Sequence, residues 1–202
     1  RFKRYDVEGM SELRSILNEV VAAKESGSDS GKWQELEDQL KSMRYNGFLT
    51  EEYTRPEDIK WSEVFYMGAG LYDDEKFADK VADIKKAYIE SSDDDDVEYE
   101  VDEFGLDIYD GQVIRDFVEG TTGKTIEDMN KPLGLTYFDK WDIYADISAS
   151  DANFVGVSIT SFEEDDGVYT IKYENSDKPF EVKLRENGDY LQFISNRWDP
   201  NR

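Results

Sequence analysis

The sequence predicts an α+β protein, in which N-terminal helices are followed by a helix-backed four-stranded antiparallel meander. Three observations support this fold class. Apolar residues recur at helical spacings through the N-terminal part of the chain. Apolar and polar residues alternate through the C-terminal third, between turn signals such as Asp166-Gly167 and Asn187-Gly188. Aromatic residues make up 14% of the chain, which is too many for a disordered chain of this charge.

Two helices are expected first, joined by the polar linker Ser26–Gly31 into an antiparallel hairpin. Asn46-Gly47 should end the second helix. The first apolar stripe comprises Met10, Leu13, Leu17, Val20 and Val21. The second comprises Trp33, Leu36, Leu40 and Met43.

A third helix is expected to begin at Thr54, which can cap it together with Glu57, and to end at Gly68-Ala69-Gly70. A fourth helix should begin near Asp73 or Asp74. The apolar side of the third comprises Ile59, Trp61, Val64 and Phe65. That of the fourth comprises Phe77, Val81, Ile84 and Tyr88.

Four adjacent acids then predict an exposed connection, because like charges repel and cannot be buried cheaply. This run is the best candidate boundary, between a helical region at 1–92 and an α+β region with an antiparallel sheet at 97–202, although both can pack as one domain. The spacing does not fit an EF-hand loop, so only weak cation binding is expected of the run. Its members are Asp93, Asp94, Asp95 and Asp96.

After the acidic run, alternation over Val97–Asp102 predicts a short edge strand. Asp110 should cap a fifth helix, which Gly120 and Gly123 close. The segment from Tyr137 to Ser148 fits both helical and strand spacing, and we favour a helical turn that runs into a loop. Helical residues after Asp110 are Val113, Ile114, Phe117 and Val118.

The meander is the clearest prediction. Its alternating strands leave one apolar face, which needs a cover that the helices can supply. Asn175–Pro179 provides the third turn signal, beside the two named above. The apolar residues of the four strands are Val155, Val157 and Ile159, then Tyr169, Ile171 and Tyr173, then Phe180, Val182 and Leu184, and finally Leu191 and Phe193.

The formal net charge is −24, from 48 acids and 24 bases. This charge repels phosphate backbones and anionic membrane surfaces, so nucleic-acid binding is not expected, while a cationic or cell-surface partner is. Cysteine and histidine are absent, which excludes thiolate and triad catalysis and most zinc sites. No stretch approaches the roughly 18 apolar residues of a membrane span. We expect no cofactor, no metal centre and no catalytic residue.

Two motifs were weighed as sites. Gly123-Lys124-Thr125 lacks the earlier glycine and the preceding strand of a phosphate-binding loop, so it predicts a helix end followed by a loop. The second is an aromatic and acidic ligand patch, where ring faces beside carboxylates can hold sugars or cationic groups. The alternative, which we favour, is that both rings fill the core and the acids face water. The patch comprises Trp141, Tyr144, Asp146 and Asp151.

The C-terminal half resembles uncharacterised secreted or lipid-anchored proteins of Gram-positive bacteria, many of them from gut species. The similarity covers about half of the chain and includes no catalytic motif, so it implies an extracellular or cell-surface location, with a lipid anchor upstream of Arg1, rather than an activity. It is carried by Phe117–Gly123, the aromatic segment Tyr137–Tyr144, Asp151–Phe154 and Gly188–Asn196.

Together these observations predict an extracellular, non-enzymatic binding or interaction module. The alternative is a histidine-free, carboxylate-based hydrolase that acts on glycans. A pocket should decide between them. Convergent buried acids with raised pKa values would favour the enzyme, and an exposed aromatic or apolar patch would favour the binder.

Overall fold

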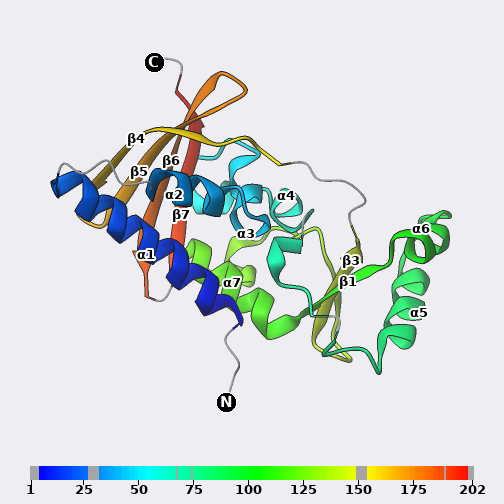
Figure 1. Ribbon diagram of the computed structural model, residues 1–202. Coiled ribbons are helices and arrows are strands. Elements are labelled where there is room, and N and C mark those ends of the chain that lie inside the picture. The colour runs from blue at the N-terminus through cyan, green and yellow to red at the C-terminus, as the bar shows by residue number, and fades with distance from the viewer. Residues whose placement is uncertain are drawn as a thin grey trace.

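A computed structural model describes residues 5–26, 32–66, 68–73, 75–148, 154–188 and 190–199. Within these residues, eight α-helices accompany two antiparallel sheets, one of which is a four-stranded meander. The α+β prediction is therefore confirmed. Figure 1 shows the large sheet at one end of the molecule and the small sheet, with α5 and α6, at the other.

The helices are α1 (Tyr5–Ser26), α2 (Lys32–Leu40), α3 (Met43–Asn46), α4 (Trp61–Tyr66), α5 (Val81–Ser91), α6 (Val97–Phe104), α7 (Gly111–Thr122) and α8 (Ile126–Met129). Three short 3₁₀ helices are η1 (Gly47–Leu49), η2 (Pro56–Asp58) and η3 (Gly68–Gly70). The strands are β1 (Leu106–Asp110), β2 (Thr136–Phe138), β3 (Ile143–Ile147), β4 (Ser158–Asp165), β5 (Val168–Asn175), β6 (Lys178–Asn187) and β7 (Tyr190–Trp198).

The large sheet has the order β4-β5-β6-β7, as the alternation predicts. Its first hairpin turns at Asp166 and Gly167, with φ values of 49° and 74°, and its second at Ser176 and Asp177, with 52° and 63°. Two successive positive φ angles give a tight turn the same twist as its strands. These two tight turns therefore fix the register of the meander.

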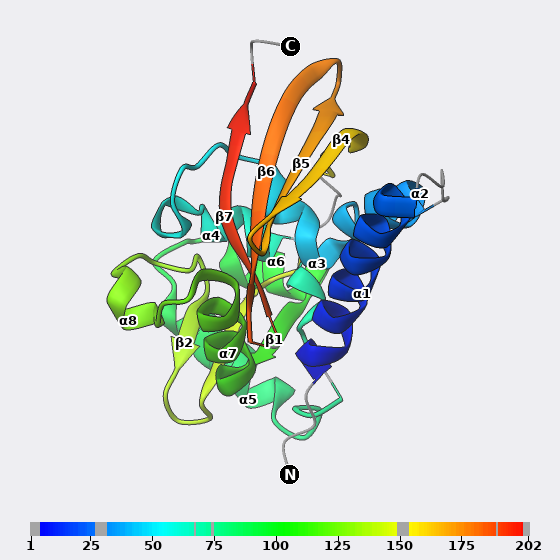
Figure 2. The ribbon, with the colours of Figure 1, turned by 90° about the vertical axis from the view of Figure 1, so that its left-hand side faces the viewer.

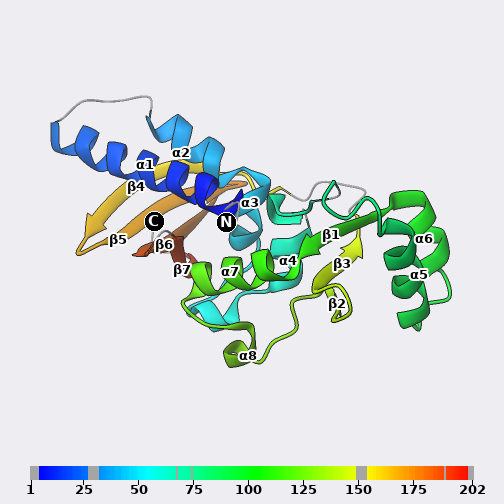
Figure 3. The ribbon, with the colours of Figure 1, turned by 90° about the horizontal axis from the view of Figure 1, so that it is seen from below.

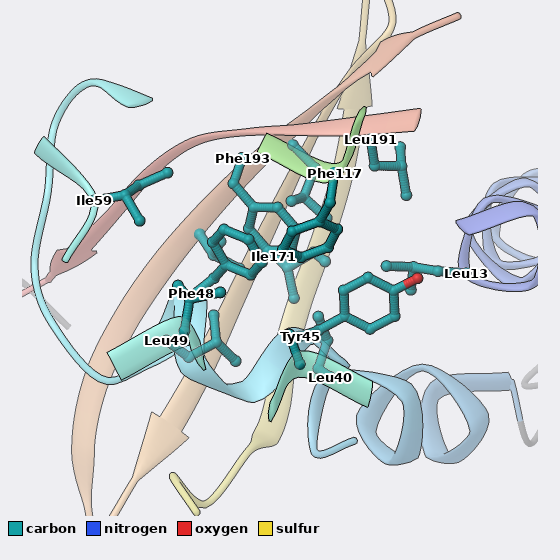
Figure 4. Close-up of a cluster of buried hydrophobic side chains, with 14 of the residues drawn as sticks. Leu13, Leu40, Tyr45, Phe48, Leu49, Ile59, Phe117, Ile171, Leu191 and Phe193 are labelled. Atoms are coloured by element: carbon teal, nitrogen blue, oxygen red, sulfur yellow. The ribbon is translucent and has the colours of Figure 1, made fainter. Parts of the chain in front are cut away.

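One face of this sheet packs on α1, α2, α3 and α7, which supply the predicted cover (Figure 2). The centre of the core is a set of aromatic rings, shown in Figure 4. Phe48 stacks on Phe193 with ring centroids 4.1 Å apart, and Phe117 lies 5.9 Å from Phe48. Val182 and Leu184 are fully buried on the same face. The core thus joins the N-terminal helices to the C-terminal meander.

The outer strand β4 has side-chain partners along its free edge. The Ile159 N–H donates to Glu37 Oε1 of α2 at 2.7 Å, and Lys24 Nζ of α1 donates to the Phe162 carbonyl at 2.8 Å. Two backbone groups that β5 does not pair are therefore bonded to the helical hairpin.

The small sheet has the order β1-β3-β2. One of its faces forms a second core cluster with α5 and α6, at the end of the molecule remote from the meander (Figure 3). Ile84 of α5, Val101 of α6 and Ile143 of β3 are fully buried there.

Two predictions in the middle of the chain are wrong. Val97–Asp102 belongs to helix α6, because Val97 and Val101 bury one helical face against α5. The segment from Tyr137 to Ser148 is not helical: β2 and β3 pair in a hairpin. Asp142 makes the turn with a φ of 51°, and Ile143 and Ala145 point into the second cluster.

The N-terminal predictions also need corrections. Thr54 caps no helix, since the short η2 begins at Pro56 and α4 only at Trp61. The fourth helix begins later than expected, at Val81. The expected second helix is divided in two: α2 ends at Leu40, and α3 ends at Asn46, as expected of Asn46-Gly47, before η1 begins. A Cβ on Gly47 would collide with the backbone of Val64. The second stripe is also less buried than predicted, because Trp33 and Met43 are partly exposed, 36% and 38%.

The boundary residues lie between two helices that share one cluster. Asp93–Asp96 are exposed, as predicted, and connect α5 to α6. The large core cluster contains side chains from both sides of this run, from Leu13 to Phe193. The division into 1–92 and 97–202 stays a prediction. The linker residues 27–31 lie outside the described residues.

The fifth helix is confirmed as α7. The Asp110 carboxylate accepts hydrogen bonds from the backbone N–H groups of Gln112 and Val113 at its start. Gly123 ends it with a left-handed φ of 74°, and a loop follows, as expected of Gly123-Lys124-Thr125.

Candidate functional site

The predicted ligand patch is divided between two sides of the small sheet. Trp141 packs beside Phe138 at the second cluster, with Lys140 Nζ 4.3 Å from its ring centre. Tyr144 packs on the large cluster instead, and its ring lies 4.9 Å from that of Tyr137. Asp151 lies outside the described residues. Both rings therefore contact the core, and their role in ligand binding stays a prediction.

Asp146, the remaining patch residue, faces Asp107 directly across strands β1 and β3. The Tyr88 hydroxyl donates to Asp146 Oδ1 at 3.2 Å, and the Ser148 hydroxyl donates to Asp107 Oδ1 at 2.7 Å. Burial raises the pKa of Asp146 above its usual value, and the charge of Asp107 adds to the rise. The described residues offer neither carboxylate an ion pair, since no salt bridge within them includes Asp107 or Asp146.

A buried phenol lies beside this pair. Tyr109 follows Asp107 by two residues on β1, so both side chains leave the strand on the same face. Its side chain is fully buried. Burial, then the charges of Asp107 and Asp146, and then a hydrogen bond with Asp107 raise the pKa of Tyr109.

A separate ion pair fastens the β2–β3 turn to α7. Arg115 donates to both carboxylate oxygens of Asp142, at 2.8 and 2.7 Å, and the Tyr137 hydroxyl donates to one of them at 3.1 Å. The hydrogen bond from Arg115 lowers the pKa of Asp142. The Asp142 carbonyl also accepts from the Gly111 N–H, so this group has a positioning role in the fold.

The acidic run was the other candidate cation site. Asp94 accepts a hydrogen bond from the Asp96 N–H, and all four carboxylates of the run are exposed. Across the described ranges, no three acidic side chains are grouped so that they could hold a metal ion. Nor does any described helix have the length and apolar character needed to cross a membrane.

A hollow of about 530 Å³ lies where the segment 51–62 meets residues 131–134, and we call it the Glu52 hollow. Its volume is in the range of small-ligand pockets. Trp61 and Pro132 contribute apolar surface. Its charged lining consists of Glu51, Glu52, Asp58, Lys60 and Lys131.

Asn196 of β7 positions one wall of this hollow. Its buried amide donates to the carbonyls of Leu49 and Glu51, at 3.2 and 3.0 Å, and its backbone bridges to Tyr53. These bonds hold the segment that carries Glu51 and Glu52 against the end of β7. A buried side-chain amide with several backbone partners is a rigid anchor.

Trp198 is an exposed aromatic residue that is hydrogen-bonded to this wall. Its backbone N–H donates to Glu52 Oε2 at 3.0 Å, and its side chain is 53% exposed. Alternation along β7 places Trp198 on the same face as Asn196, the face that holds the Leu49–Tyr53 segment. The Trp198 backbone is thus bonded to a carboxylate of the Glu52 hollow, while the exposed indole is not one of the side chains that line it.

One acid of the hollow, Asp58, is held in the charged form by its partner. Arg55 donates to both oxygens of Asp58 at 3.0 Å, and this interaction lowers the pKa of Asp58. Lys60 lies between Glu51 and Glu63, at 3.4 and 2.8 Å. The hollow therefore presents fixed charges, with three acids against two lysines.

A second hollow, of about 470 Å³, lies on the open face of the meander beside Lys183 and Arg185. The open face is a ladder of alternating charges, in which Glu181 contacts Lys172, Lys183 and Arg197. Three cations of this face are thus paired with one acid, which is the character of a solvated sheet face.

The sequence interpretation missed the Glu52 hollow. Glu52 and Trp198 are separated by 146 positions, and only the register of β7 brings them together. The sequence offers two weak local signals. One is the acidic pair Glu51-Glu52 before a tyrosine, and the other is a tryptophan near the end of the last alternating strand. No family model, curated protein or solved structure compared with this chain matches it.

Proposed function

We propose that the protein is a non-enzymatic binding module that recognises a cationic group of its partner at the Glu52 hollow. The observation that carries the proposal is the exposed Trp198, whose backbone N–H is bonded to the Glu52 carboxylate of this hollow. An indole face attracts ammonium and guanidinium groups, and neighbouring carboxylates add a direct charge interaction.

The charge of the whole chain supports the same partner chemistry. A net charge of −24 concentrates cations around the protein and raises their rate of encounter. This field favours partners of positive charge, but it does not determine where on the surface they bind. Glu52, which lines the hollow and accepts from the Trp198 N–H, would supply the place.

The alternative function, a carboxylate-based hydrolase acting on glycans, would need two acids beside a cleft. Asp107 and Asp146 are the best pair among the described residues, because they face each other and the pKa of Asp146 is raised. Neither residue lines either of the two hollows described. The arrangement therefore favours binding over hydrolysis. Release of reducing sugar from a glycan, abolished by Asp146→Asn, would support the hydrolase instead.

The test is calorimetric titration with N-acetyl-lysine amide and with its uncharged counterpart, N-acetyl-norleucine amide, in about 0.15 M salt to screen distant charges. We expect only the lysine probe to bind. Trp198→Ala should weaken that binding about tenfold or more, and Glu52→Gln about fivefold, since a cation–π contact contributes about 1–2 kcal/mol where it is desolvated.

Trp33→Ala is the matched control, because Trp33 is a partly exposed tryptophan far from this hollow, on α2. It should bind the lysine probe like the wild type. Equal binding of both probes, or equal losses from Trp33→Ala and Trp198→Ala, would contradict the proposal.

The extracellular or cell-surface location is part of this proposal and rests on the resemblance of the C-terminal half to exported proteins. Fractionation of the source cells, followed by immunodetection, tests it. Recovery of the protein solely with cytosolic markers would contradict an exported location.

A further inference from the structure

We propose that Asn187-Gly188 is a site of spontaneous deamidation, and that the reaction loosens helix α7 from the hairpin of β6 and β7. The site is separate from the Glu52 hollow and does not depend on the function proposed there. Two observations carry the proposal. The Asn187 amide is bonded to the end of α7, and the other Asn-Gly dipeptide of the chain, Asn46-Gly47, is held in the core.

The reaction begins when the backbone nitrogen of Gly188, after losing its proton to the solvent, attacks the side-chain carbonyl carbon of Asn187. A bond forms between this nitrogen and Cγ, the bond from Cγ to Nδ2 breaks, and Nδ2 leaves as ammonia with a proton from water. Water then opens the cyclic imide at either of its two carbonyls, which gives aspartate or isoaspartate. The net reaction consumes water and releases ammonia, without oxidation or reduction. A following glycine favours the attack, because it has no side chain to hinder it and its backbone is adaptable.

Asn187-Gly188 lies at the turn between β6 and β7, where this rearrangement is accessible. Gly188 is exposed, stands outside the strands and has a φ of 61°. Among the residues that the structure describes, its N–H has no hydrogen-bond partner, so the attacking nitrogen is free. The amide of the half-buried Asn187 donates to the Gly120 carbonyl at 3.0 Å. A single neutral hydrogen bond of this kind is readily broken, which releases the amide for the reaction.

The other Asn-Gly dipeptide serves as an internal comparison, because the fold restrains it. Asn46 is 2% exposed, its Nδ2 donates to the carbonyls of Leu40 and Val155, and its Oδ1 accepts from the Val155 N–H. The Gly47 N–H donates to the Tyr45 carbonyl, so the nitrogen that would attack is engaged. Asn46 can therefore react only after the core opens, which costs far more than the fraying of a hairpin end.

The effect of the reaction follows from the place of Asn187 at the C-terminus of α7. The last four carbonyls of a helix lack partners within it, and this end of the helix carries a partial negative charge. Asn187 donates to the Gly120 carbonyl at 3.0 Å, and Gln192 donates to the Thr122 carbonyl at 2.7 Å, so the hairpin caps the helix. Deamidation replaces the first donor by a carboxylate, which repels both the carbonyl and the negative end of the helix. It also adds a negative charge to a chain of net charge −24.

The first experiment follows deamidation of the full chain at mildly alkaline pH by peptide mapping and mass spectrometry, which detects a mass increase of about 1 Da. In the folded protein, Asn187 should react at least about tenfold faster than Asn46. In guanidinium chloride the two should react at similar rates, because neither is then restrained. Equal rates in the folded protein, or no reaction of Asn187 while the unfolded chain reacts, would overturn the proposed site.

The second experiment measures the thermal unfolding of Asn187→Asp, which has the structure of the aspartate product. It should melt about 3–6 °C below the wild type, and the backbone amides in the last turn of α7 should exchange faster with solvent. Asn175→Asp is the matched control, since it adds the same charge at the hairpin of β5 and β6, where Asn175 accepts from the Ser176 hydroxyl. It should melt within about 1 °C of the wild type. Equal melting temperatures of the two variants would overturn the proposed loosening of α7.

Discussion

The ring of Tyr190 packs directly on Gly120 and fills the space that a side chain on this glycine would need. Gly120 lies inside helix α7 and Tyr190 starts strand β7, so this contact sets how closely the helix approaches the edge of the large sheet. The Asn187 side chain, which donates to the Gly120 carbonyl at 3.0 Å, fixes the same approach.

Gly120→Ala should therefore destabilise the protein by about 1–3 kcal/mol, because the new methyl group overpacks the interface. An exposed helical glycine would behave in the opposite way and gain about 0.5–1 kcal/mol from the same change. Chemical denaturation of the single variants and of Gly120→Ala/Tyr190→Ala measures the effect. The double variant should recover stability relative to Tyr190→Ala alone, and a Gly120→Ala protein as stable as the wild type would contradict the prediction.

Val182→Asp and Lys183→Asp compare the two faces of strand β6. Val182 is fully buried opposite Ile171, so an aspartate there becomes an unpaired buried charge and should largely unfold a protein of about 5–15 kcal/mol total stability. Lys183 lies on the open face near Glu181, and its change should cost no more than about 1 kcal/mol. Thermal melts decide the matter, and equal losses would mean that the open face is buried too.

Asp142→Asn tests the pH dependence of the Arg115–Asp142 pair. The pKa of Asp142 is lowered in the folded state, so the pair stabilises the fold above the usual aspartate pKa of about 3.9 and is lost as pH falls through the lower folded value. Asparagine keeps the left-handed turn, because it tolerates positive φ. Unfolding at pH 7 should show a loss of about 1 kcal/mol, and unfolding at a pH below the folded-state pKa of Asp142 should show almost none. A loss of the same size at both pH values would contradict the assignment.

Ionic strength should raise the melting temperature of the wild type. A net charge of −24 repels itself across the surface, and moving from 0.01 to 0.1 M salt shortens the Debye length from about 30 to about 10 Å. Replacing all four aspartates of the run at 93–96 by asparagine should reduce this dependence. A melting temperature that falls over the same range of sodium chloride would show that specific ion pairs outweigh the general repulsion.

The meander and α7 could be predicted because their signals are local. Asp166-Gly167 specifies a tight turn by itself, and Asp110 specifies a helix start within three residues. The apolar alternation through Ile171 and Val182 then assigns each strand its buried face. Such elements need no knowledge of what packs on them.

The middle of the chain could not be predicted in this way. Val97 and Val101 fit a strand by alternation and a helix by their spacing of four, and burial against α5 decides for the helix. Tyr137 and Tyr144 have helical spacing, yet they face each other across β2 and β3. In both segments short-range pattern is ambiguous, and tertiary contacts select the structure.

The candidate sites were harder still, because each pairs residues from distant segments. Asp146 was predicted as part of a ligand patch, but its facing residue Asp107 lies on β1, a strand the sequence did not indicate. Glu52 and Trp198 meet only after the meander has formed against the Leu49–Tyr53 segment. No spacing rule within one element reports such a contact.

Two charged side chains from α1 and α2 are bonded to the outer strand β4, and these bonds have a consequence for assembly. An uncovered β4 would offer the Ile159 N–H and the Phe162 carbonyl to a strand from another molecule, and such edges seed fibrous aggregation. Glu37 and Lys24 form hydrogen bonds with these two groups, so the hairpin of α1 and α2 blocks the addition of a strand from another molecule. A nascent or proteolysed chain without that hairpin would keep its meander pattern but expose both backbone groups to strand addition.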